Sequence, residues 1–170
     1  MAPVAPNFFL EAKRPSGGAD VAKRQACYDG AIEARAMHQL QSYGKDEPVY
    51  DGNAYTITTT YHAGNLNMYA THITQGLGGS PEYHMSQVDG WNTLGNPNTC
   101  RQGFTAFRNA RDWAQEQRDA FILAANERAR TVNAEPSSLE SPDHNYGLLE
   151  LCARLRADWR LSSQLPSPAF

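Results

Sequence analysis

Apolar and polar positions along the chain follow two periods, and these predict an ordered series of strands and helices. The run 7–13 is short and aromatic, and Arg14-Pro15 ends it, which is typical of a buried strand. From Val21 to Tyr43 apolar residues recur at helical spacing, with Asp20 as the expected N-cap and Gly44 as the stop. The side chains expected to be buried along this helix are Val21, Tyr28, Ile32, Ala36 and Leu40.

The middle of the chain predicts a hairpin and then a second, longer helix. The segments 53–61 and 66–73 are β-prone and are joined by Ala63-Gly64-Asn65, which indicates antiparallel pairing. Residues 76–98 are rich in Gly, Pro and Asn, so we expect a loop with one helical turn. A helix follows over 99–132, with a break near Gln117 left open, and its apolar stripe consists of Phe107, Ala110, Ala114, Phe121 and Ala125.

This order predicts an α/β fold in which the first helix connects two parallel strands as a right-handed crossover. We expect one domain over 6–133. The remainder, 134–170, reads as a linker, a short amphipathic helix marked by Leu148 and Trp159, and a Pro/Ser tail.

The composition of the chain bears on nucleic-acid binding, membrane insertion, secretion and metal binding through cysteine. The 170 residues carry a net charge of −3, so nucleic-acid binding would depend on local basic clusters. No apolar run is long enough to cross a bilayer, and the N-terminus lacks the features of a signal peptide. We therefore expect an intracellular protein, nuclear or cytoplasmic, with no membrane partner. The three cysteines are too scattered for a disulfide framework or a zinc site, and nothing indicates an oligomeric state.

The main candidate for a catalytic or metal-binding motif is Glu11-Ala12-Lys13, at the end of the first strand. Residues two apart on a strand share a face, so Glu11 and Lys13 should lie side by side. A carboxylate there can ligate Mg²⁺, and the ammonium can orient a water and offset phosphate charge. The alternative interpretation is a surface ion pair.

The pattern from Pro6 to Lys13, followed by Val21 to Ala31, resembles the PD-(D/E)XK nuclease-like superfamily. In particular it is similar to fungal proteins that have such a domain and are uncharacterised. The similarity continues through Pro48 to Asp51, the hairpin, and Phe107 to Ala114, so it covers roughly Pro6 to Ala129.

The resemblance implies a restriction-endonuclease-like mixed sheet flanked by helices, and Mg²⁺-dependent hydrolysis of phosphodiester bonds, with Mn²⁺ as a possible substitute. Glu11 would be the metal ligand, Lys13 the lysine beside the attacking water, and Gln25 a supporting glutamine on the helix. The partner would be nucleic acid, DNA rather than RNA. The residues we expect to contact it are Lys23, Arg24, Arg108 and Arg111, although a solvated helix face would also explain the last two.

One departure from the superfamily concerns the second metal-binding carboxylate, an Asp that normally precedes the Glu-x-Lys strand. None of residues 1–10 is acidic, so we expect a fold incomplete at its N-terminus or an inactive member. Asp20, Asp29 and Asp51 could substitute, but they read as a helix cap, a helix surface residue and a turn residue. The alternative function is a nuclease-like module that binds nucleic acid or protein without chemistry.

Overall fold

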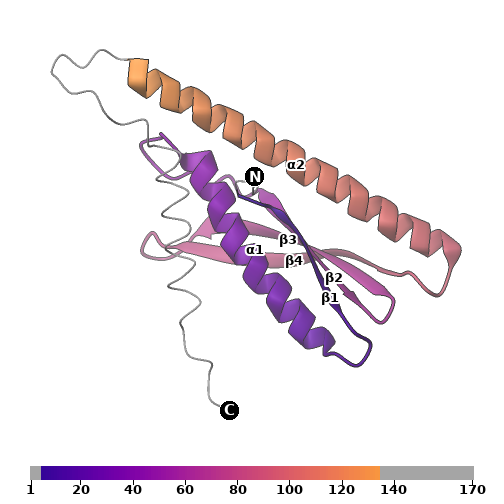
Figure 1. The fold of residues 1–170 in the computed structure, drawn as a ribbon. Helices are drawn as coiled ribbons and strands as arrows, with labels where there is room; N and C mark the ends of the chain where they lie inside the picture. Colours follow the sequence, from indigo (N-terminus) through magenta and orange to yellow (C-terminus); the bar gives the residue numbers. More distant parts are fainter. Residues whose placement is uncertain (1–4, 135–170) are drawn as a thin grey trace.

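The computed structural model describes residues 5–134, and these form a four-stranded mixed sheet with a helix on each face (Figure 1). The elements are β1 (Phe8–Lys13), α1 (Ala19–Ser42), β2 (Ala54–His62), β3 (Asn65–Gln75), β4 (Pro81–Asn92) and α2 (Pro97–Ala134). The predicted α/β class is confirmed. The expected C-terminal linker, amphipathic helix and tail lie outside the described residues, apart from Ala134.

The strands lie in the order β1-β2-β3-β4, so β1 and β4 are the edges of the sheet. β1 pairs parallel to β2, with Phe8 opposite Ile57 and Lys13 opposite His62, while the other two pairings are antiparallel. The predicted crossover through α1 and the predicted hairpin are therefore confirmed.

Our expectation of a loop over 76–98 is wrong, because Pro81–Asn92 form strand β4. Its residues are mostly exposed and include Gly90, so the stretch lacks the clean alternation that marks a half-buried strand. The strand is stabilised by its pairing with the whole length of β3, from Asn65–Asn92 to Gln75–Pro81, and not by the β-propensity of its own residues.

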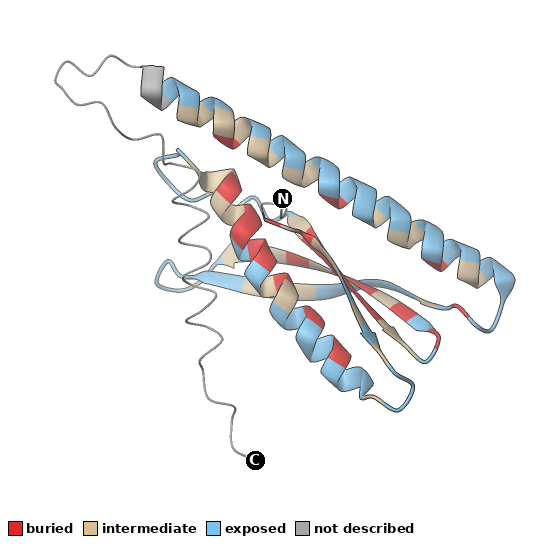
Figure 2. Ribbon diagram, viewed as in Figure 1, coloured by how far each residue is buried: buried red, intermediate tan, exposed pale blue. Residues whose placement is uncertain are grey.

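Helix α1 packs on the sheet through its small residues, and this also differs from our expectation. The buried positions include Ala22, Ala26, Gly30 and Ala34, whereas Val21, Tyr28 and Ile32 are exposed. Ala36 and Leu40 are buried as expected. Figure 2 shows the buried positions of α1 in red. At Gly30 the backbone comes so close that a Cβ would lie 2.5 Å from Thr71 Oγ1. The face of α1 that lies against the sheet is therefore the one whose small residues let the helix backbone come close to the threonine-rich strands.

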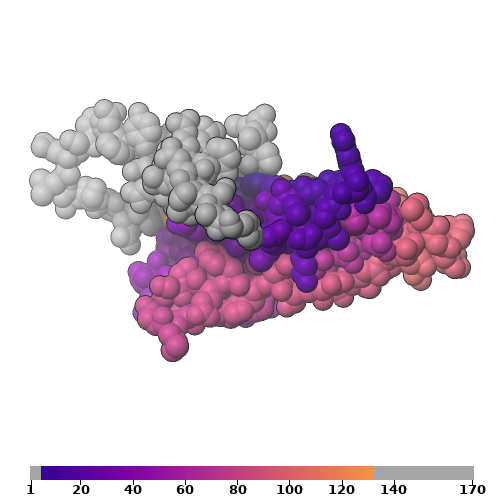
Figure 3. All heavy atoms as spheres, turned by 90° about the horizontal axis from the view of Figure 1, so that it is seen from below, coloured from indigo at the N-terminus to yellow at the C-terminus, as the bar shows by residue number. Residues whose placement is uncertain are grey.

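Helix α2 covers the opposite face of the sheet and runs unbroken through Gln117, where the sequence left a break open. Phe107 contacts Phe8 with ring centroids 4.9 Å apart, and Phe121 contacts Tyr55 at 4.7 Å. Beyond one end of the strands the two helices meet directly, in a core cluster of Ala5, Ala36, Met37, Leu40 and Ala125. The space-filling view shows the N-terminal segments, in indigo, lying against the magenta strands (Figure 3).

Candidate functional site

Glu11 and Lys13 lie side by side on edge strand β1, as predicted. The Nζ atom of Lys13 is 3.5 Å from Oε2 of Glu11, and each side chain is 26% exposed. Glu11 lies opposite Thr60 in the register, so it projects from the sheet face that α1 covers. The pair is thus reachable from solvent but bordered by a helix.

Helix α1 brings Asp29 against this pair. The pKa of Asp29 is raised, first because the carboxyl is partly buried and then because Glu11 adds negative charge and a hydrogen bond; Lys13 opposes the rise. We interpreted Asp29 as a helix surface residue; it is half-buried, and the packing of α1 turns it toward β1.

Glu33 lies one turn further along α1, on the same flank as Asp29. It is only 5% exposed, and its Oε2 atom has no hydrogen-bond partner. Burial, together with the charge of Asp29, raises the pKa of Glu33 to about 10, so the group is protonated at neutral pH. We call Glu11, Asp29 and Glu33 the carboxyl row.

The carboxyl row is not a ready-made three-ligand site. Across residues 5–134, no three His, Cys, Asp or Glu side chains are arranged to hold a metal ion. Glu11 and Asp29 are the two members beside each other, whereas Glu33 is influenced by the charge of Asp29 alone.

The remaining predicted residues on α1 lie at different distances from the row. Gln25 is exposed and precedes Asp29 by one turn, on the same helix flank. Lys23 Nζ lies 5.9 Å from the ring centroid of Tyr69 on β3. Arg24 pairs with Asp20 at 3.2 Å on the solvent side, and Asp20 lies in the first turn of α1, not at its N-cap.

Arg108 and Arg111 belong to α2, on the opposite face of the sheet from Lys23 and Arg24. Arg111 is 2.8 Å from Asp112, and Arg108 lies 3.5 Å from the hydroxyl of Thr105. The structure therefore does not bring the four predicted nucleic-acid contacts onto one surface.

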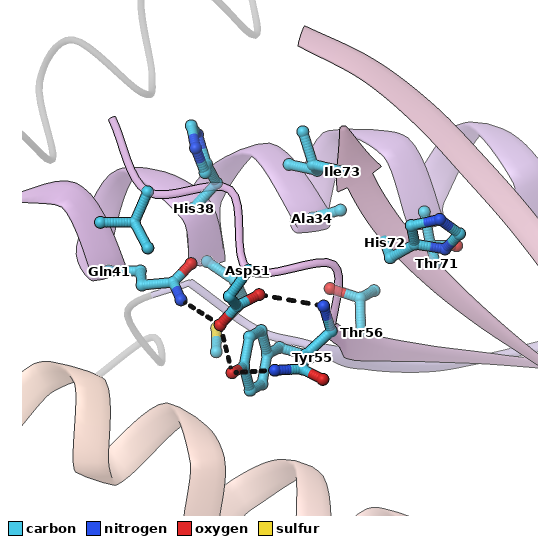
Figure 4. Close-up of a pocket in the computed structure, with 12 residues that line it drawn as sticks. Ala34, His38, Gln41, Asp51, Tyr55, Thr56, Thr71, His72 and Ile73 are labelled. Carbon is cyan, nitrogen blue, oxygen red and sulfur yellow. Dashed lines mark hydrogen bonds between the residues drawn. The ribbon is translucent and has the colours of Figure 1, made fainter. Parts of the chain in front are cut away.

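A separate small pocket opens between α1, the segment before β2, and strands β2 and β3 (Figure 4). Asp51 holds its rim by accepting hydrogen bonds from Gln41 Nε2 at 2.6 Å, Tyr55 Oη at 2.7 Å and the Asn53 N–H at 2.9 Å. Burial alone would raise the pKa of Asp51, but these hydrogen bonds outweigh it and lower the pKa. The cavity volume of about 20 Å³ has room for one water molecule.

Sequence reasoning missed Glu33 as a site residue and named Asp29 only as one of three substitutes for the second carboxylate, although a signal for both was present. Gln25, Asp29 and Glu33 follow one another at steps of four, which places them on one flank of a helix. Which flank faces the Glu-x-Lys strand depends on the contact of Gly30 with the sheet, and no local pattern encodes that contact.

Comparisons with known proteins leave the family open, because the chain matches no family model, no curated protein and no solved structure. Among the described helices, none is both long and apolar enough to cross a membrane.

Proposed function

We propose that the protein is a Mg²⁺-dependent hydrolase of phosphodiester bonds in nucleic acid, with Glu11 and Asp29 as metal ligands and Lys13 beside the attacking water. The observation that carries the proposal is the contact between the carboxyls of Asp29 and Glu11, next to the Lys13 ammonium. It supplies a second carboxylate, which the sequence before Glu11 does not contain.

The donor set suits Mg²⁺, or Mn²⁺ in its place. Mg²⁺ prefers oxygen ligands, is usually bound through one or two carboxylates, and keeps several of its waters. Glu11 and Asp29 supply two carboxylates for this purpose. When bound, such an ion would act as a Lewis acid on a phosphoryl oxygen and increase the acidity of its water.

The protein's own groups would orient the substrate and offset its charge. The Lys13 ammonium is partly exposed, so it can approach a phosphate oxygen while it still contacts Glu11. The exposed amide of Gln25 is able to donate a hydrogen bond to a water or phosphate on the same side of α1. Lys23 and Arg24 add positive charge near the start of this helix, so we assign the substrate to the α1 side of β1 and not to Arg108 and Arg111.

Cleavage of labelled oligonucleotides tests the proposal. Single-stranded DNA, duplex DNA and RNA are incubated with Mg²⁺, Mn²⁺ or EDTA. We expect metal-dependent cleavage that falls by about 10²-fold or more in Glu11→Gln, Asp29→Asn and Lys13→Met. Asp20→Asn is the matched control, since it removes an exposed carboxylate from the same helix. Absence of cleavage with either metal, or full activity of Glu11→Gln, would contradict the proposal.

The alternative is a module that binds nucleic acid without chemistry. It is favoured by the pairing of the Glu11 carboxyl with both Lys13 and Asp29, which leaves no free carboxylate at the pair. This alternative predicts salt-sensitive DNA binding that survives Glu11→Gln but weakens when Lys23 and Arg24 are both changed to Glu. Binding that does not respond to salt would count against it.

A further inference from the structure

Two histidines lie directly opposite each other near the tip of the β3–β4 hairpin. His72 pairs with His84 in the strand register, and their rings are stacked with centroids 5.1 Å apart and planes inclined by 23°. Thr71, the neighbour of His72, faces α1 beside Gly30, so His72 projects from the other face of the sheet. The imidazole pair is therefore separate from the carboxyl row.

Toward the hairpin tip, the next cross-strand pair on the same face is Thr74 and Glu82, which adds oxygen donors. The Nε2 atom of His84 is 2.8 Å from Thr74 Oγ1 and 4.0 Å from Glu82 Oε2. The side chains of His84 and Glu82 are 45% and 59% exposed, so an ion from solvent can reach them. Two imidazoles, a carboxylate and a hydroxyl thus gather at one accessible place on adjacent strands.

We propose that His72 and His84 bind one divalent transition-metal ion, such as Zn²⁺ or Cu²⁺, with Glu82 as a third donor and water in the remaining positions. Imidazole nitrogen is a preferred ligand of these ions. With Zn–N bonds of about 2.0–2.1 Å and a tetrahedral angle, the ring centroids of two histidine ligands lie about 5 Å apart. The observed 5.1 Å is the distance that direct cross-strand pairing gives, and the stacked rings must rotate before one nitrogen of each can face a shared ion.

The strand pairing holds the two ligands in place before any ion arrives. Because the register fixes both Cα atoms, binding requires rotation of the rings and a small movement of Glu82, with no change in the backbone. Among residues 5–134 no three His, Cys, Asp or Glu side chains already stand in a coordinating arrangement, so Glu82, whose Oε2 is 4.0 Å from His84 Nε2, must move before it can act as the third donor. Mg²⁺ should not compete, because it prefers oxygen ligands.

Calorimetric titration of the untagged, EDTA-treated and desalted protein with ZnCl₂ tests the site. We expect one equivalent of Zn²⁺ to bind to the wild type, and at least tenfold weaker binding in His72→Ala and in His84→Ala. His62→Ala is the control, because it removes an imidazole from the same sheet at a position whose Nε2 lies 3.2 Å from the Pro15 carbonyl oxygen. Glu82→Gln should weaken binding less than either histidine change.

A spectroscopic readout separates a metal site from a structural role of the pair. Electron paramagnetic resonance of the Cu²⁺-loaded protein should show coupling to two nitrogens in the wild type and in Glu11→Gln, and coupling to fewer nitrogens in His84→Ala. Because His84 is exposed, its substitution should leave the far-ultraviolet circular dichroism unchanged. Failure of the wild type to bind Zn²⁺, or unchanged affinity in His84→Ala, would overturn the proposal. Loss of binding in Glu11→Gln alone would assign the ion to the carboxyl row and would equally overturn it.

Discussion

The carboxyl of Asp29 on α1 lies beside that of Glu11 on β1, close enough for each to act on the charge of the other and of the Lys13 ammonium. Two acidic groups in such contact repel each other once both are ionised, so they cost stability unless a cation joins them. The contact therefore links the candidate function to measurable effects on stability.

Asp29→Asn should stabilise the metal-free protein at neutral pH. The fold raises the pKa of Asp29, so its contribution is complete at low pH and declines as pH rises and the group ionises. The stability gain of the variant should therefore increase with pH in urea denaturation. Added Mg²⁺ should raise the melting temperature of the wild type but not that of the variant. Asp20→Asn should change stability by less than about 1 kcal/mol and keep the Mg²⁺ effect.

Glu33→Gln should remove a decline of stability with pH. Folding raises the pKa of the Glu33 carboxyl from 4.5 to about 10. Below about pH 4.5 the group is protonated in both states, and from there to about pH 10 only the folded state keeps the proton, so the free energy of unfolding falls as pH rises. Urea denaturation at about pH 5 and pH 8 should show this fall in the wild type and less of it in the variant. Glu116→Gln, an exposed change on α2, should reproduce the wild-type slope.

Gly30→Ala should destabilise the protein although alanine favours helices by about 1 kcal/mol. The new Cβ would lie 2.5 Å from Thr71 Oγ1 and 3.6 Å from Thr58 Cγ2, so α1 must move away from the sheet. Overpacking of this kind costs about 1–3 kcal/mol. Thr71→Ala in the same chain should recover part of the loss. A Gly30→Ala variant as stable as the wild type would show that the contact does not set the position of α1.

Asn7→Ala should be among the more damaging single changes. The Asn7 side chain is 1% exposed, and its amide donates to the carbonyl oxygens of Tyr55 at 2.8 Å and Ala114 at 2.7 Å. The change removes two buried hydrogen bonds, at about 0.5–1.5 kcal/mol each. Thermal denaturation should show a lowered midpoint, while Asn53→Ala at an exposed position should have a much smaller effect.

Arg128→Met should loosen the contact between the two helices. The guanidinium of Arg128 on α2 donates to the carbonyl oxygens of Tyr43 and Leu40 at the end of α1, the latter at 3.1 Å. These carbonyls lie at the C-terminal end of α1, where the helix supplies few donors; the Leu40 oxygen also accepts a long bond of 3.4 Å from the Tyr43 N–H. We expect a loss of about 1–3 kcal/mol in urea denaturation, because hydrogen bonds to charged groups are of that size. Arg130→Met, at an exposed position two residues on, should be close to neutral.

Much of the fold could be predicted from the sequence. The aromatic run before Arg14-Pro15, the stop at Gly44 and the Thr/Tyr-rich hairpin each carry a strong local signal, and β1, α1, β2, β3 and α2 all follow. Strand β4 could not be predicted, because it is exposed, rich in polar residues and stabilised by its pairing with β3.

The candidate site, too, could be predicted from the sequence only in part. The alternation of a strand by itself determined that Glu11 and Lys13 share a face, and that prediction is confirmed. Only the tertiary structure decided that Asp29 and Glu33 join them. The rotation of α1 about its axis depends on how closely Gly30 approaches Thr71, and a helical period specifies which residues share a flank but not which flank meets the sheet.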